Sequence, residues 1–94
     1  MSDERIEVLR GALDVLDKQG WSQGFYTNPD GSHCLAGAIN TAGMAMSSYS
    51  ILDAKNALAL KNIEEWNDAP ERTVEDVKQL LKQAIYDLEN EAGS

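Results

Sequence analysis

The chain has 94 residues, which is enough for one domain with a single modest hydrophobic core. Hydrophobic residues make up 43% and charged residues 26%, an ordinary globular balance that excludes an intrinsically disordered chain. Sixteen acidic and eight basic residues give a formal net charge of −8, which opposes direct binding to nucleic acid and attachment to anionic membranes.

The single cysteine excludes a disulfide within the chain, so we expect a reducing, cytoplasmic setting. No apolar run approaches the roughly 20 residues that a membrane span needs. The opening Met-Ser-Asp-Glu-Arg enters an amphipathic pattern, which is not that of a signal peptide. Between Gln19 and Leu52 the only charged side chain is Asp30. The ends of the chain therefore predict solvated helices, and the middle predicts a buried element or a contact surface.

The first predicted element is a helix from about Asp3 to Gln19. Its apolar residues recur every three or four positions and form one stripe. The stripe contains Ile6, Leu9, Leu13 and Leu16, widened by Val8, Ala12 and Val15. Gly20 stands where a left-handed cap would end the helix, and Trp21 is placed for the hydrophobic contact that often follows.

Residues 21–35 are the candidate for β structure. Phe25 and Tyr26 favour strands, and residues 28–31 read Asn-Pro-Asp-Gly, which is typical of a tight turn. We expect a short β-hairpin or an ordered loop. Because an isolated two-stranded hairpin is weak in water, either form should lie against the helices.

A second helix, from about His33 or Cys34 to Met46, is the predicted centre of the fold. The stretch contains no acidic or basic side chain apart from its first histidine, and nearly every residue is small or apolar. A helix that is apolar on most sides should be surrounded by protein. The other elements are therefore expected to pack against it.

Two more helices follow. The third is predicted from about Ser50 to Trp66, with an alanine-rich apolar face, and it stops before Pro70. The fourth begins after Thr73, a good N-cap, and carries an unbroken apolar stripe. That stripe contains Val74, Val77, Leu81, Ala84 and Leu88, flanked by Leu80 and Ile85.

Together these elements predict a mainly α fold. We expect a compact bundle of about four helices, with the short hairpin or ordered loop between the first and second. Residues 1–94 form one domain, since no repeat, linker or low-complexity tract divides them, and residues 90–94 are expected to fray.

Cys34 is the first candidate for chemistry. At the start of a helix, free amide groups and the helix dipole would lower the pKa of the thiol and favour a nucleophilic thiolate. His33 is a poor general base for it, because consecutive residues do not face each other on a helix. The alternative is that Cys34 is a small buried residue, as free cysteines usually are. One Cys and one His also fall short of a metal-ligand set, so we expect no metal and no cofactor.

The turn between the last two helices is the second candidate. It gathers four side chains of different chemistry: Trp66, Asn67, Asp68 and Arg72. Loops of that kind can recognise a small ligand. A purely structural interpretation is also complete, with the indole in the core, the amide and carboxylate at helix ends, and the guanidinium paired with a carboxylate. If the loops meet at one end of the bundle, one shallow pocket could be lined by Trp21, His33, Cys34, Trp66, Asn67 and Asp68.

The third candidate is a contact surface in the charge-poor middle. Small residues there would let another helix approach closely: Gly37, Ala38, Ala42, Gly43 and Ala45. Met44 and Met46 are adaptable side chains found at binding surfaces as well as in cores. Whatever the helices leave uncovered would face a protein partner or a second copy. The alternative is full burial within the monomer.

Several short blocks resemble an uncharacterised family of short hypothetical proteins from actinobacteria and their phages, a domain of unknown function. The blocks are Gly20-Trp21, Asp30-Gly31, Cys34-Leu35, Gly37-Ala38, Trp66-Asn67-Asp68, Pro70, and Arg72-Thr73 with Val77. The resemblance spans Leu9 to Ala84, and its most specific pieces are the Cys-Leu-x-Gly-Ala and Trp-Asn-Asp blocks. It implies a cytoplasmic protein in a bacterial host, with a phage as one source, and it brings no activity or catalytic residue.

From the sequence we expect a small acidic module that binds a host protein or a second copy, for example as a homodimer, rather than an enzyme. The alternative is a small-ligand-binding or cysteine-dependent protein that uses Cys34 and the Trp66–Asp68 turn. A decoy for a nucleic-acid-binding protein is a third interpretation. It would need carboxylates along one face, whereas here they are spread over three helices with Lys and Arg between them.

Overall fold

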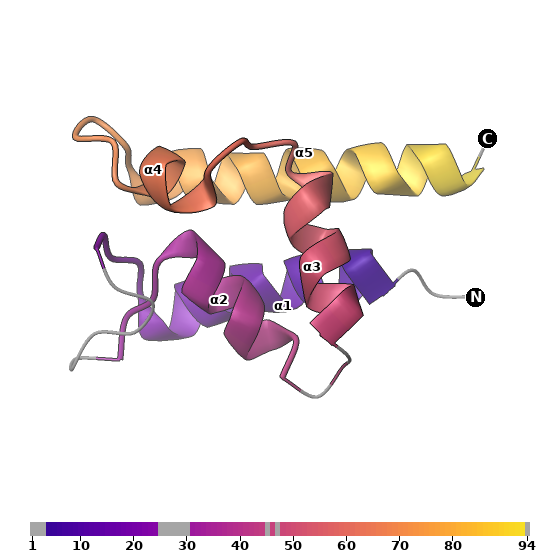
Figure 1. Cartoon of the computed structure of the whole chain (residues 1–94), viewed down its shortest axis with the longest axis horizontal. Coiled ribbons are helices and arrows are strands. Elements are labelled where there is room, and N and C mark those ends of the chain that lie inside the picture. The colour runs from indigo at the N-terminus through magenta and orange to yellow at the C-terminus, as the bar shows by residue number, and fades with distance from the viewer. Residues whose placement is uncertain (1–3, 25–30, 45, 47, 94) are drawn as a thin grey trace.

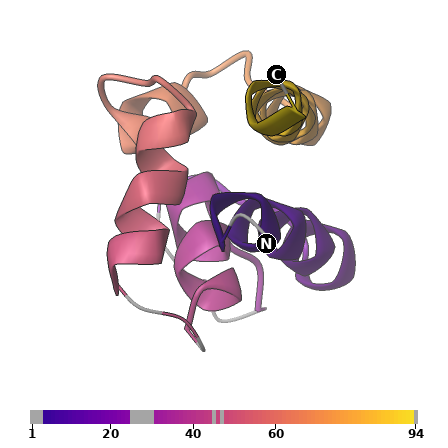
Figure 2. The same ribbon diagram turned by 90° about the vertical axis from the view of Figure 1, so that its right-hand side faces the viewer.

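The computed structural model describes residues 4–24, 31–44, 46 and 48–93. Within them lie five helices: α1 (Glu4–Gln19), α2 (Leu35–Ala42), α3 (Ser48–Ala57), α4 (Ile63–Asn67) and α5 (Val74–Gly93). The long helices α1 and α5 lie side by side and run antiparallel, while α3 runs across their direction (Figures 1 and 2). The predicted mainly α-helical bundle is confirmed. No helix of the described chain is long and apolar enough to cross a membrane.

Helix α1 is the element around which the others are arranged. It makes the main contacts with α2, α3 and α5. One face supplies its buried side chains: Ile6, Val8, Leu9, Ala12 and Leu16. Gly20 ends the helix with a φ of +91°, and its amide donates to the carbonyl oxygen of Leu16 at 3.0 Å. Glycine adopts this left-handed conformation without steric cost, so the predicted cap is confirmed.

Helix α5 begins with a reciprocal cap. The amide of Asp76 donates to Oγ1 of Thr73 at 3.2 Å, and the amide of Thr73 donates to Oδ2 of Asp76 at 3.1 Å. Each side chain thus satisfies an amide that has no partner within the helix. The apolar stripe is buried as predicted: Val77, Leu81, Ala84, Ile85 and Leu88. The helix continues to Gly93 and so includes most of the residues expected to fray.

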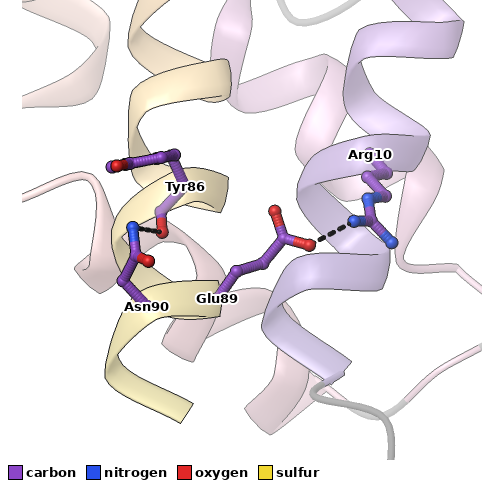
Figure 3. A network of polar contacts seen from close by, with 4 residues as sticks. All are labelled: Arg10, Tyr86, Glu89 and Asn90. Atoms are coloured by element: carbon purple, nitrogen blue, oxygen red, sulfur yellow. Dashed lines mark hydrogen bonds and ion pairs between the residues drawn. The ribbon is translucent and has the colours of Figure 1, made fainter. Parts of the chain in front are cut away.

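Two ion pairs join α1 to α5, one from the middle of α1 and one from near its end. Arg10 Nη2 lies 2.7 Å from Glu89 Oε2, and Figure 3 shows the two side chains facing each other from the two helices. Near the end of α1, Lys78 Nζ lies 2.6 Å from Asp17 Oδ1. The hydrogen bond and charge of Lys78 lower the pKa of the Asp17 carboxyl, and the same bond raises the pKa of Lys78. Ion pairs at the protein surface contribute about 0–1 kcal/mol each, so these two add little to the stability of the helix pair.

Helix α2 is shorter than predicted, is buried in its first part only, and is not the centre of the fold, because α1 makes the main contacts between helices. Every residue from Leu35 to Ile39 is buried. The helix ends at Ala42, not Met46. The Gly43 amide still donates four residues back, to the Ile39 carbonyl at 3.0 Å, but the Met44 amide donates only three residues back, to the Thr41 carbonyl at 3.3 Å, so the chain turns out of the helix there.

The small residues of α2 are used inside the monomer. A Cβ added at Gly11 of α1 would lie only 2.9 Å from the Cβ of Ala42, so the two helices touch at this point. Ala38 has no exposed surface. The close approach predicted for this helix therefore occurs between α1 and α2 of the same chain.

The predicted third helix is in fact two helices. Helix α3 ends at Ala57 and α4 begins at Ile63. Between them Ala59 has a φ of +58°, which a non-glycine residue rarely adopts and which no helix can contain. Asn62 then caps α4, since its side chain accepts a hydrogen bond from the amide of Glu65 at 3.0 Å. The apolar pattern runs unbroken across this interruption, which is why the sequence predicted one helix.

The segment between α1 and α2 forms an ordered loop in its described part. Trp21 and His33 make an isolated bridge in which the Ser22 amide donates to the His33 carbonyl at 2.9 Å and the His33 amide donates to the Gly20 carbonyl at 3.0 Å. The bridge is parallel, whereas the two strands of a hairpin are antiparallel. The turn predicted at residues 28–31 lies mostly outside the described residues.

Candidate functional site

Three chain segments meet where α1 ends, α2 begins and α4 ends, toward the left in Figure 1. They are residues 20–24, residues 31–35 and residues 66–72, and we call this region the loop cluster. The structure therefore brings together the loops that the sequence placed at one end of the bundle. The question is whether their side chains face a ligand or each other.

Asn67 is the centre of the loop cluster and has no exposed surface. Its Oδ1 accepts hydrogen bonds from Nε1 of Trp21 at 2.7 Å and from the amide of Leu35 at 2.9 Å. Its Nδ2 donates to the carbonyl of Ser22 at 3.2 Å and to Oδ1 of Asp68 at 3.1 Å. A side-chain amide has two donors and an oxygen with two lone pairs, so Asn67 is fully used by the protein itself.

Further hydrogen bonds close the cluster around this asparagine. Nε2 of Gln23 donates to the carbonyl oxygens of Asn67 at 3.0 Å and Ala69 at 2.9 Å. The amide of Gly24 donates to Oδ1 of Asp68 at 2.9 Å. Gln23 was missed by the sequence analysis, because a glutamine in a loop carries no signal for partners more than forty positions away.

Trp66 and Arg72 form a pair of their own. The guanidinium carbon of Arg72 lies 3.9 Å from the centroid of the Trp66 ring, and Nε of Arg72 donates to the Trp66 carbonyl at 2.8 Å. A guanidinium over an indole face is a favourable cation–π contact. Arg72 therefore stacks on an aromatic ring, where the structural interpretation of the sequence had paired it with a carboxylate. Trp66 packs against the core, as that interpretation expected.

His33 is buried between the loop and α1. One ring nitrogen, Nε2, lies 2.6 Å from Oε1 of Gln19, the last residue of α1. Its main chain forms the bridge with Trp21 described above. The histidine thus contributes to the docking of the loop on the helix.

Cys34 is the N-cap of α2, as predicted, and its side chain is only 4% exposed. Its Sγ accepts a hydrogen bond from the amide of Gly37 at 3.3 Å. Burial nevertheless raises the pKa of the thiol, and it outweighs the lowering by the amides of Gly37 and Ala36. The carboxylates of Asp68 and Glu64 raise this pKa further. The lowered pKa expected from the helix start is therefore not what the structure gives, because desolvation dominates.

We expect Cys34 to react slowly with thiol reagents in the folded protein. The neutral thiol is favoured and the sulfur is covered, so alkylation by iodoacetamide at pH 7.5 should be at least about tenfold slower than in denaturing urea. Mass spectrometry of timed samples measures both rates. Equal alkylation rates in the two conditions would show that the Cys34 thiol is accessible in the folded protein and would again make it a candidate nucleophile.

The remaining candidates lie outside the loop cluster. Met46 is half-buried against the core, whereas Met44 is 79% exposed. Two further apolar side chains that the sequence did not single out are exposed nearby in the chain, Tyr49 by 77% and Leu52 by 54%. We call Tyr49 and Leu52, which both lie on α3, the α3 patch; Met44 lies before this helix, in the turn that follows α2. Among the described residues, no group of three or more His, Cys, Asp or Glu side chains could hold a metal ion.

The fold and the loop cluster define a small helical domain whose connecting loops are joined through one buried asparagine. Residues 1–87 match a family of unknown function, DUF6197, and the chain belongs to that family. Comparisons with curated proteins and with solved structures gave no match. The resemblance to an uncharacterised family is confirmed at this level, while an origin in actinobacteria or their phages stays a prediction.

Proposed function

We propose that the protein is a small acidic interaction module that binds another protein through the α3 patch. The observation that carries this proposal is a contrast within the charge-poor middle. Residues 32–39 are buried, but Met44, Tyr49 and Leu52 expose more than half of their surface. Large apolar side chains left in water without an internal role favour a contact surface.

The geometry of the patch suits a protein partner. Tyr49 and Leu52 are three residues apart on α3, so their side chains are neighbours on the helix surface. Tyrosine is enriched at protein interfaces, where it supplies apolar contact area. The patch can therefore serve as the apolar centre of a contact.

The overall charge of the chain indicates which partner the patch fits. Close to the patch the charges are mixed: Asp53 is exposed and Glu4 accepts a hydrogen bond from Oγ of Ser50, whereas Lys55 lies three residues after Leu52 on α3. The whole chain carries a net charge of −8. We therefore propose a host protein with an apolar centre and a basic rim, because opposite potentials favour association. A second copy would bring the same negative charge and is the less favoured occupant.

The loop cluster gives less support to the alternative of a ligand-binding or cysteine-dependent protein. Each hydrogen-bonding group of Asn67 is already occupied, and the Cys34 thiol is buried with a raised pKa. The cytoplasmic setting remains part of the proposal and is supported by the unpaired, buried thiol.

Site-specific photo-crosslinking tests the proposal. The crosslinking residue p-benzoylphenylalanine replaces Tyr49 in one protein and Tyr86 of α5 in the other, and both are produced in the organism that encodes the chain. Tyr86 is a matched control, since it is 63% exposed and its ring points away from α1 (Figure 3). We expect a crosslinked product from position 49 that is absent from position 86 and is lost with Leu52→Ser.

The outcomes are distinct. A crosslinked product with about twice the 10.3 kDa mass of the chain would show that the partner is a second copy and not a host protein. Equal products from both positions, or none from position 49, would contradict the α3 patch as the contact surface.

A further inference from the structure

A groove lies beside the α3 patch and shares Leu52 with it, while its other lining residues have no role in the function proposed above. It is bounded by the end of α3, the connection to α4 and the beginning of α4, and its volume is about 330 Å³. Polar groups make up most of its lining, and its smaller apolar part includes Leu52, Leu60 and Ile63. Two lysines, Lys55 and Lys61, line the same groove.

The two lysines place two positive charges together in an acidic chain. Of the other cations, Arg10, Lys18 and Lys78 form ion pairs and Arg72 stacks on Trp66, whereas Lys82 is exposed on α5. Among the described residues, no ion pair involves a lysine of the groove.

One carboxylate, that of Glu64, also lines the groove, and it has an interaction of its own within the protein. Two ammonium groups and one carboxylate leave a local excess of one positive charge. An anion is thus favoured in the groove although the protein as a whole is negative, because solvent ions screen distant charges beyond about 8 Å.

We propose that this groove binds a small monocarboxylate with a short apolar body. The ammonium groups of Lys55 and Lys61 would hold the carboxylate, and the apolar body would rest on Leu52, Leu60 and Ile63. The volume lies at the lower end of the roughly 300–1,000 Å³ typical of ligand pockets, which suits a molecule of few atoms. A phosphate has no apolar part to cover the side chains of Leu52, Leu60 and Ile63.

Titration of the full chain with hexanoate, followed by amide shifts in two-dimensional NMR spectra, tests the proposal. We expect saturable shifts that concentrate at residues 52–64. Hexanol has the same body without the charge, and acetate has the charge without the body. Both should bind at least about tenfold more weakly, since each loses one of the two contributions. Inorganic phosphate should bind no better than acetate. Equal affinities for hexanoate and hexanol would overturn the proposal.

Matched variants locate the site. Lys55→Gln and Lys61→Gln keep most of the length of the side chain but remove its charge, and each should weaken hexanoate binding. Lys82→Gln on the exposed surface of α5 is the control and should leave that affinity unchanged. A Lys82→Gln effect as large as that of Lys61→Gln would show that only the net charge matters and would refute the site.

Two variants distinguish a failure of the groove proposal from a failure of the proposed protein contact. In the Tyr49→Ser variant, hexanoate should still shift the amide signals, and the shifted signals should still belong to residues of the groove. Lys61→Gln should leave the crosslinking at position 49 intact. A loss of hexanoate binding in Tyr49→Ser would show that the groove does not bind independently of the α3 patch and would overturn the proposed site.

Discussion

Asn67→Ala is expected to lower the free energy of unfolding by about 3–5 kcal/mol, from the cost of one buried and one partly buried donor left without a partner together with the loss of packing. Nε1 of Trp21 and the amide of Leu35 both donate to the oxygen that alanine lacks. The substitution also leaves a space at a position with no exposed surface. Because small domains have about 5–15 kcal/mol of stability, this loss is a large share of the total. Urea denaturation followed by circular dichroism measures it.

Asn90→Ala is the matched control for this prediction. Asn90 is exposed on α5, and its side chain donates to the carbonyl of Tyr86 at 3.1 Å, as Figure 3 shows. Its replacement should change the free energy of unfolding by no more than about 0.5 kcal/mol. If Asn67→Ala unfolds at the same urea concentration as Asn90→Ala, the loops are held by apolar contacts and not by the asparagine.

Gly43→Ala is expected to destabilise the fold by about 1–3 kcal/mol, the usual cost of overpacking a core. A Cβ at this position would collide with Cγ1 of Ile51 on α3 and lie 3.0 Å from its Cδ1. The backbone is not the obstacle, because a φ of −93° and a ψ of 6° are open to other residues. Without the collision, Gly43→Ala would stabilise the fold by about 0.4–1 kcal/mol, because alanine lowers the conformational entropy of the unfolded chain. A loss of stability would therefore point to the contact with Ile51.

A double-mutant cycle with Ile51→Ala tests this cause. Removing the isoleucine side chain clears the space that the new methyl group needs, so Gly43→Ala should cost much less in the Ile51→Ala background. Thermal or urea unfolding of the four proteins supplies the interaction energy. Equal costs in both backgrounds would rule out the collision and place the effect elsewhere in the turn between α2 and α3.

The sequence predicted best where periodicity and capping agreed. In α5 the apolar stripe and the Thr73 cap mark the same helix, and both are found. The interruption between α3 and α4 could not be seen in the same way. The apolar pattern continues through it with Leu58, Leu60 and Ile63. Ala59 has a positive φ, but alanine is not a residue type that predicts one.

The sequence predicted which residues of the candidate site lie together, but not which of them form hydrogen bonds or stack with one another. The Trp-Asn-Asp block and Trp21 do lie together, yet they bind one another. Sequence reasoning weighed the helix dipole at Cys34 but could not supply the burial that opposes it. The partner of Arg72 was misjudged for a related reason, because a carboxylate and an aromatic face both suit a guanidinium.

The antiparallel pairing of the two long helices has a consequence for how the chain is made. Arg10 and Glu89 meet although they are 79 positions apart. When the ribosome releases α1, the helix that will cover much of its apolar stripe has not yet been translated. The apolar stripe of α1 must therefore stay out of aggregates until α5 (Val74–Gly93) has been translated, since non-local contacts form late and leave apolar surface exposed meanwhile.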